Sequence, residues 1–378
     1  MSSLLEEMPL IDHHCHGLVH GELDRQEFEA FLTEADGPGS LHPSLFDTQV
    51  GLAVRSICAP LLDLPRFASP DDYLARRAEL GADEAARRLL EVTGIAHYLV
   101  DTGHLPDLLT SPAELAAYTD AAGHEVVRLE VVAEQMIGMV EPRDFADTVG
   151  EALHARAQNA VGFKSIAAYR TGLDLDPTRP SDADVEVAAR NWISASSEED
   201  VPRLVDRTLI RFLIWTALDL GRPLQFHVGY GDADVNLRQC DPLLLTPLIR
   251  ATVGLGLPVM LLHNYPFHRA AGYLAQVFDH VYVDVGLALH NVGSRARAIV
   301  AELLELAPFA SVLFSSDAFG LAELYAVSTT LFGQALTAFF DDGIARDFWP
   351  AAEAERLARM IASGNARRAY GLADPART

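Results

Sequence analysis

The sequence predicts an α/β fold, a distorted (β/α)8 barrel of the TIM type, and three observations carry this prediction. Eight short apolar runs recur along the 378 residues, stretches of helical character separate them, and polar side chains close several runs. Apolar runs that alternate with helices are typical of parallel strands buried on both faces. Polar side chains after five different strands converge in a barrel, whereas a doubly wound sheet uses one crevice. The expected strands are residues 8–14, 95–101, 125–131, 159–164, 223–228, 258–263, 280–285 and 311–316.

The first expected strand ends in Asp12-His13-His14-Cys15-His16. Side chains alternate along a strand, so His14 and His16 share one face and His13 and Cys15 point elsewhere. Neutral imidazole is the commonest nitrogen ligand for zinc-like ions, so this pair is half of a metal site. Taken alone the pair is weak evidence, because histidines two residues apart also occur by chance, and remote ligands are needed to complete the site.

Four later strands end in residues that suit such a site. Lys164, His227, His263 and Asp317 each close a strand-like apolar run. Asp317 could both contact a metal and take a proton from water, although it could instead cap the following helix. An isolated ammonium is costly in an apolar interior, so Lys164 must pair, stay neutral or be modified.

Two insertions interrupt the barrel pattern, and we expect them to belong to one domain spanning residues 1–378. The first, about residues 20–92, is predicted to be a helical cap over the site, with helices at residues 24–35 and 69–92. The second, about residues 171–204, is rich in Asp, Pro and Ser, and is predicted to be a loop with a short helix and a candidate lid.

Composition excludes several classes of protein. The net charge of −24 disfavours binding to nucleic acid or acidic membrane surfaces. Three cysteines without paired spacing indicate a reducing compartment, so we expect a cytoplasmic protein. No apolar stretch approaches the roughly 20 residues of a membrane span, and the first strand begins too early to follow a cleaved signal.

The residues at the strand ends resemble those of the amidohydrolase superfamily, in particular the amidohydrolase-2 type. Its barrel members carry His-x-His on strand one, Lys on strand four, His on strands five and six, and Asp on strand eight. The opening Asp12-x-His14-x-His16 and the closing Asn365-Ala366-Arg367-Arg368-Ala369-Tyr370 match the same pattern and bracket the chain.

A finer resemblance links the chain to one branch of that superfamily. The stretch from Gly162 to Arg170 and the motif Gln225-x-His227-x-Gly229-x-Gly231-Asp232 look like the branch fused to glutamine-synthetase-like proteins. That branch includes hydrolases of γ-glutamyl amides, and related branches hold uronate isomerases and metal-dependent decarboxylases.

The resemblance implies a divalent metal, with zinc expected first and manganese or iron as alternatives. In the two-metal form, Lys164 becomes a carbamate that bridges both ions, and His227 and His263 complete the second. In the one-metal form, His14, His16, His227 and Asp317 bind the ion. His263 then contacts the substrate or stabilises charge, and Lys164 remains an ammonium.

The function that we expect is hydrolysis of a C–N amide bond in a small carboxylate-bearing substrate such as a γ-glutamyl amide. Asp317 and His263 are the candidate catalytic residues. Arg170 and Tyr169 follow strand four closely and could bind a substrate carboxylate, although Arg170 could instead pair with the acidic loop 174–176. Asp232 could bind a substrate ammonium or simply form a turn.

Two other function classes stay open. A one-metal non-oxidative decarboxylase or sugar-acid isomerase would use the same barrel, and a non-catalytic interaction module is the third alternative. The partner that we expect is a small molecule. A homodimer is implied by the resemblance alone, because the apolar region Phe332 to Phe340 could be either core or interface. His97, His104 and His124 are expected to be core or surface histidines.

Overall fold

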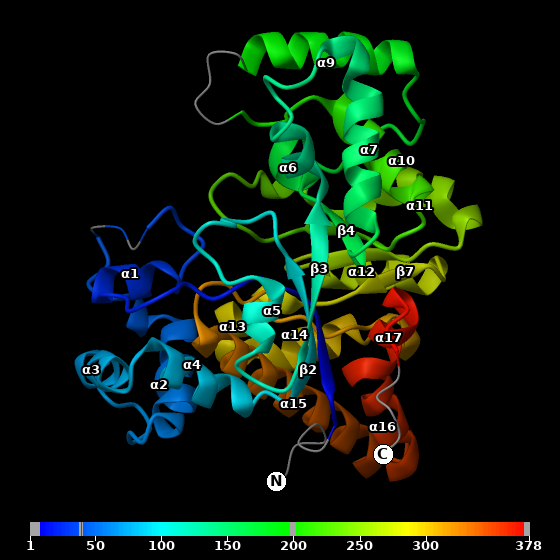
Figure 1. Ribbon diagram of the computed structural model, residues 1–378. Helices are drawn as coiled ribbons and strands as arrows, with labels where there is room; N and C mark the ends of the chain where they lie inside the picture. Colours follow the sequence, from blue (N-terminus) through cyan, green and yellow to red (C-terminus); the bar gives the residue numbers. More distant parts are fainter. Residues whose placement is uncertain (1–7, 38, 40, 197–201, 374–378) are drawn as a thin grey trace.

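The computed structural model describes residues 8–37, 39, 41–196 and 202–373 of the chain. Seven parallel strands form one sheet in sequence order, and helices surround it (Figure 1). The strands are β1 Leu10–Cys15, β2 Ile95–Asp101, β3 Ala122–Arg128, β4 Gly162–Ser165, β5 Leu224–Val228, β6 Val259–His263 and β7 Val281–Val283. The sheet curls into a distorted TIM barrel, as the sequence predicts.

The expected eighth strand at residues 311–316 is not a regular strand. This segment lies between β7 and β1 and bonds to both, because Leu313 N donates to Val283 O at 3.0 Å and His13 N donates to Phe314 O at 3.1 Å. A parallel bridge joins Val283 to Val312, but no continuous ladder forms. Isolated backbone bonds therefore close the barrel at the point where the sequence predicts a full strand.

Two other strand predictions are shifted. The third strand ends at Arg128, because Leu129 begins helix α6 (Leu129–Glu134). The fourth strand starts at Gly162 rather than at residue 159. The carboxyl ends remain close to the predicted positions, and these ends carry the candidate site.

The insertion after β1 forms helices beside the sheet (Figure 1). They are α1 Arg25–Ala30, α2 Gln49–Leu61, α3 Pro70–Leu80 and α4 Ala82–Glu91. The single helix expected over residues 69–92 is two helices, because Gly81 between them has a φ of 83° and breaks the run. Ser69 caps α3 by accepting a hydrogen bond from the backbone of Asp72.

The insertion after β4 is more helical than predicted. Helix α8 (Ala167–Arg170) precedes it, and the insertion itself holds the 15-residue α9 (Asp182–Ser196), where the sequence predicts only a short helix. The buried side chains of α9 follow helical spacing: Val185, Ala188, Ala189 and Trp192. The acidic residues among them hid this apolar pattern in the sequence.

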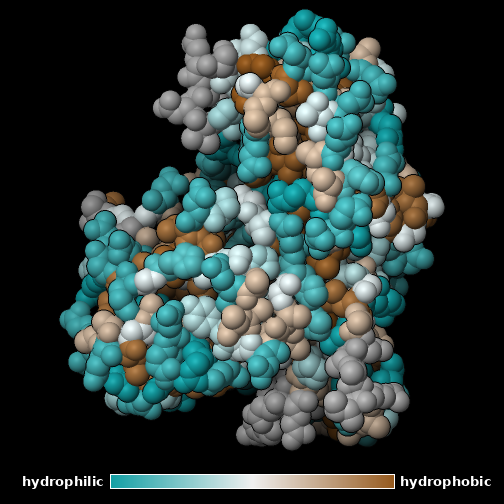
Figure 2. Space-filling view, in the orientation of Figure 1, coloured by the Kyte–Doolittle hydropathy of each residue, from teal (hydrophilic) through white to brown (hydrophobic). Residues whose placement is uncertain are grey.

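The remaining helices complete the outer layer and the core. They are α5 Pro112–Ala116, α7 Phe145–Ala157, α10 Arg207–Asp219, α11 Thr246–Thr252, α12 His268–Val277, α13 Gly286–Val292, α14 Ala296–Leu303, α15 Ala322–Ala345, α16 Ala351–Arg359 and α17 Asn365–Tyr370. Phe332 and Phe340 on α15 are buried within the chain, so they belong to its core rather than to an exposed interface. Hydrophilic side chains cover most of the face drawn in Figure 2.

Candidate active site

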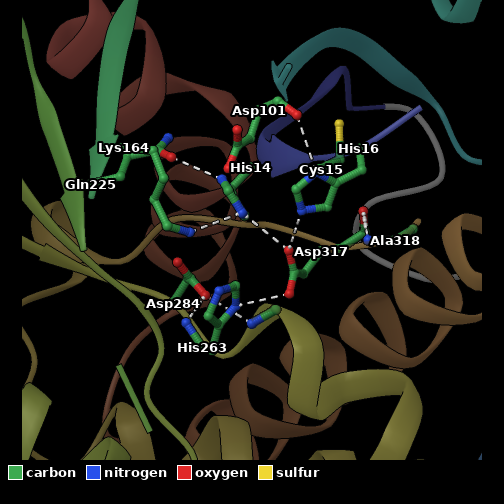
Figure 3. A network of polar contacts seen from close by, with 12 residues as sticks. His14, Cys15, His16, Asp101, Lys164, Gln225, His263, Asp284, Asp317 and Ala318 are labelled. Atoms are coloured by element: carbon green, nitrogen blue, oxygen red, sulfur yellow. Dashed lines mark hydrogen bonds and ion pairs between the residues drawn. The ribbon is translucent and has the colours of Figure 1, made fainter. Parts of the chain in front are cut away.

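Three histidines surround one carboxylate at the carboxyl ends of the strands (Figure 3). His14 Nε2 lies 3.1 Å and His16 Nε2 lies 3.4 Å from Asp317 Oδ1. His263 Nδ1 lies 3.3 Å from the other oxygen, Oδ2. The alternation of side chains along β1 (Leu10–Cys15) and into the next residue directs His14 and His16 to the same centre, as the sequence predicts.

The other two predicted ligands lie beside this group. Lys164 Nζ is 3.3 Å from His14 Nε2, and the ring centroids of His227 and His263 are 4.5 Å apart. The fold therefore brings together all six residues that the sequence assigns to a metal centre, from β1, β4, β5, β6 and the segment that closes the barrel.

Hydrogen bonds fix the tautomers of the first two histidines. Gln225 Oε1 accepts a hydrogen bond from His14 Nδ1 at 2.8 Å, and the Asp101 carbonyl accepts one from His16 Nδ1 at 3.2 Å. Gln225 is itself oriented by its Nε2 group, which donates to the Tyr370 hydroxyl at 2.8 Å. Because both Nδ1 atoms carry the proton, both Nε2 atoms offer lone pairs to the centre.

Burial also sets the charge of the site. It lowers the pKa of His14 to about 4, with a further contribution from Lys164, and lowers the pKa values of His227 and His263 well below 6.5. These imidazoles are therefore neutral at pH 7, the form that binds metals. Burial lowers the pKa of Lys164 to about 8, so a fraction of its amine is neutral and able to react with carbon dioxide.

Several buried polar atoms of the site lack a hydrogen-bond partner and could coordinate a cation. His227 Nε2, both ring nitrogens of His263 and Asp317 Oδ1 are buried and have no hydrogen-bond partner. Buried polar atoms are normally paired, because leaving them unpaired costs free energy. The ligand atoms of His14, His263 and Asp317 lie within 4.8 Å of one another, and so do those of His14, His16 and Asp101. Nitrogen and oxygen donors of this kind suit zinc, manganese or iron.

The backbone is strained at two of these residues. His263 has a φ of 68° and Asp317 a φ of 49°, values that side chains rarely adopt. Asp284 Oδ1 accepts a hydrogen bond from His263 N at 2.9 Å, and Asp317 N donates to His14 O at 3.0 Å. Strain of this kind gathers at functional sites, where the surrounding structure holds it.

A cavity of about 660 Å³ opens from this centre. The six residues predicted to bind metal line it, and so do Phe31 and Glu34 from the segment after α1. Its volume suits a small-molecule substrate.

Residues 59–372 match the protein family described as Amidohydrolase. The chain belongs to the amidohydrolase family. Residues His14 and His16 lie before the matched region, so the structure, rather than that match, joins them to the other ligands.

Known proteins agree with this assignment. The chain is 29% identical to Protein fluG of Emericella nidulans over 98% of its own length and 46% of that protein, so it spans about half of that relative. A Lactobacillus casei structure described as a metal-dependent hydrolase shows 30% identity and a TM-score of 0.86, covering 98% of both chains. A glucuronate isomerase from Caulobacter crescentus shares the fold, with a TM-score of 0.67, 15% identity and coverage of 99% of this chain and 93% of that chain.

The three predicted substrate residues of this amidohydrolase all line the cavity. The Tyr169 ring centroid lies 4.4 Å from that of His227. Arg170 pairs with Glu134, Nη2 to Oε1 at 3.0 Å, instead of the acidic loop 174–176. Asp232 Oδ1 accepts a hydrogen bond from Asp234 N at 2.9 Å, so it forms a turn as well as part of the cavity wall.

Sequence reasoning missed several residues of this amidohydrolase site. Arg128 lines the cavity and pairs with Asp101, Nη2 to Oδ2 at 2.7 Å. Asp101 could have been found, because it also ends a predicted strand. His104, expected to be a core or surface histidine, lines the cavity with its ring centroid 5.2 Å from that of His16. Glu34 follows α1 in an irregular segment and had no sequence signal.

Within the described part of this amidohydrolase, no helix combines the length and apolar character needed to cross a membrane.

Proposed function

We propose that this amidohydrolase-family enzyme hydrolyses a C–N amide bond of a small carboxylate-bearing substrate, with γ-glutamyl amides as the class to test first. The observation that carries the proposal is the group of buried, unsatisfied nitrogen and oxygen atoms around Asp317. The choice of amides over other bonds follows from the motifs around Lys164 and His227.

Six residues would hold the metal: His14, His16, Lys164, His227, His263 and Asp317. When bound, a divalent ion would supply Lewis acidity, which polarises a carbonyl and makes a water molecule more acidic. A carbamate on Lys164 would add two oxygen donors to the set. The partly neutral amine of Lys164 is the form that such a modification requires.

Asp317 is assigned the proton transfers. Burial alone would raise its pKa, but His263, His14 and His16 lower it well below the usual value, so the carboxylate is ionised at neutral pH. It can accept a proton from the attacking water and return that proton to the leaving amine. His263 is held by the backbone contact to Asp284 and faces the same point, so in the one-metal form, where it is not a ligand, it can stabilise the developing oxyanion.

The alternative is a one-metal decarboxylase or sugar-acid isomerase. The contact that favours it is Lys164 Nζ at 3.3 Å from His14 Nε2, which an unmodified amine satisfies. In that case Lys164 would act as an ammonium near the substrate.

The first experiment measures metal per chain by elemental analysis on protein purified without chelator in the presence of bicarbonate. Two equivalents, falling to one in Lys164→Met, would support the bridged hydrolase. One equivalent in both proteins would favour the alternative. The same preparations are assayed for amine release from γ-L-glutamyl-p-nitroanilide and for isomerisation of D-glucuronate, and activity on the sugar acid alone would overturn the hydrolase proposal.

A further inference from the structure

The three arginine side chains that line the cavity are already paired. Each arginine on the wall holds a carboxylate within ion-pair distance, so none brings an unbalanced positive charge to a substrate. The pairs are Arg128–Asp101 at 2.7 Å, Arg170–Glu134 at 3.0 Å and Arg203–Asp234 at 2.8 Å.

Three other acidic side chains of the same cavity have no cationic partner among the residues that the structure describes. Glu34, Asp36 and Asp232 line it without an ion pair to any lysine, arginine or histidine in the described parts of the chain. Glu34 is partly buried, whereas Asp36 and Asp232 are exposed nearer the solvent. Burial, with the charges of Asp317 and Asp232, raises the pKa of Glu34 to about 8. A cation beside Glu34 would relieve this cost.

The segment that carries Glu34 is fixed close to the metal-type residues. The ring of Phe31, three residues earlier, packs edge-on against Phe319 with centroids 4.9 Å apart. Phe319 follows Asp317 by two residues, and both line the cavity. The cap therefore holds Glu34 beside the site through this aromatic contact.

A buried nitrogen without a hydrogen-bond partner borders the open space beside Gly231 and Asp232. His227 is 4% exposed, and its Nε2 atom has no hydrogen-bond partner although it lies on the cavity wall. Tyr169 stands against His227, and a Cβ on Gly231 would come within 2.9 Å of His227 Nε2. Gly231 thus leaves open the space next to Asp232.

We propose that Glu34, supported by Asp232, forms a subsite for a primary ammonium group on the substrate, at the end of the molecule away from the bond that is cleaved. This inference rests on the proposed function, and it adds that the substrate carries a positive charge whether or not it also carries a carboxylate.

The physical basis is the balance of charge. A substrate ammonium would pair with Glu34 in a partly desolvated site, where a charge-assisted hydrogen bond is stronger than in water. Tyr169 lines the same cavity and supplies an aromatic ring for a cation–π contact. A lone carboxylate at this end would instead meet three unpaired acids.

The test measures binding without turnover. Zinc-loaded protein is titrated calorimetrically with 5-aminopentanamide and with hexanamide, which replaces the ammonium by a methyl group. We expect the amine to bind about tenfold more tightly to the wild type. The preference should disappear in Glu34→Gln and remain in Glu79→Gln, a matched change on the outer surface of the cap. Equal affinity of the wild type for both probes, or an unchanged preference in Glu34→Gln, would overturn the inference.

A charge-reversal variant distinguishes loss of the subsite from unfolding of the protein. Glu34→Lys should prefer glutaramate, an anion of similar length, over 5-aminopentanamide, and a retained preference for the amine would refute the subsite. Hydrolysis separates this inference from the proposed function. Equal cleavage of γ-L-glutamyl-p-nitroanilide and glutaryl-p-nitroanilide would refute the subsite alone, whereas amine-selective binding without any amide cleavage would refute the hydrolase alone.

Discussion

A buried ion pair joins the cap to the barrel, and breaking it should destabilise the protein strongly. Arg77 on α3 donates from Nε to Glu323 Oε1 on α15 at 2.9 Å, and the Tyr73 hydroxyl donates to the same oxygen at 3.0 Å. The side chain of Glu323 is 0% exposed and that of Arg77 is 7% exposed. Arg77→Met removes the guanidinium and leaves the carboxylate buried with only the tyrosine as partner.

Leaving one buried charge without its partner costs about 3–5 kcal/mol. A chain of 378 residues has an unfolding entropy of about 0.8 kcal/mol per kelvin at its midpoint. Arg77→Met should therefore lower Tm by about 4–6 °C. The side chain of Arg87 on the neighbouring helix is 43% exposed and pairs only at the surface, so Arg87→Met should change Tm by less than about 1 °C.

The assay is thermal unfolding followed by circular dichroism and calorimetry in a double-mutant cycle. Glu323→Gln keeps an acceptor for Tyr73 and should cost less than Arg77→Met. The double variant should lose less stability than the sum of the two single variants, because no carboxylate is left buried without its cation. Additive losses, or an Arg77→Met midpoint within about 1 °C of the wild type, would refute this account.

Three further predictions concern the site. Gly231→Ala puts a Cβ against the Tyr169 hydroxyl and His227 Nε2. Steady-state kinetics should show kcat/KM reduced by about tenfold or more, with Tm nearly unchanged. Unaltered kinetics would contradict this packing. The pKa of Glu34 is raised from 4.5 to about 8 in the folded protein, so the wild type loses stability as pH rises between these values. In urea unfolding, Glu34→Gln and the wild type should be equally stable below pH 4.5. Above pH 8 the variant should be more stable by about 1–3 kcal/mol, less than the ~5 kcal/mol that the full pKa shift corresponds to. A variant that is more stable at low pH would show that the sign is wrong. Chelation should lower Tm by about 5 °C when free metal had been about 1,000 times its Kd, and a chelator effect that persists in Asp317→Asn would argue against this carboxylate as a ligand.

The candidate site was predictable because strand periodicity is a local property. His14 and His16 share a face through alternation alone, and Lys164, His227 and His263 could be found because each closes an apolar run. The eighth segment shows the limit of this reasoning. Its apolar run predicts a strand, but only isolated bonds form, since its hydrogen bonds depend on how β7 and β1 approach one another.

Residues outside the strands escaped prediction for a related reason. Glu34 lies in an irregular segment, and only the packing of Phe31 on Phe319 brings it to the cavity. Arg170 lines the cavity, as its predicted substrate role requires, but its ion-pair partner is Glu134 on α6 rather than the acidic loop 174–176. Neither contact leaves a pattern in the residues nearby.

The sequence by itself determined the alternation of strands and helices, and the chemical types of the six residues at the strand ends, because both depend on neighbours along the chain. Tertiary structure alone decided which charges are balanced: Arg170 by Glu134, Arg77 by Glu323, and Glu34 by no cation among the described residues. The physical reason is that ion pairing and desolvation depend on distances of a few ångströms between segments far apart in sequence.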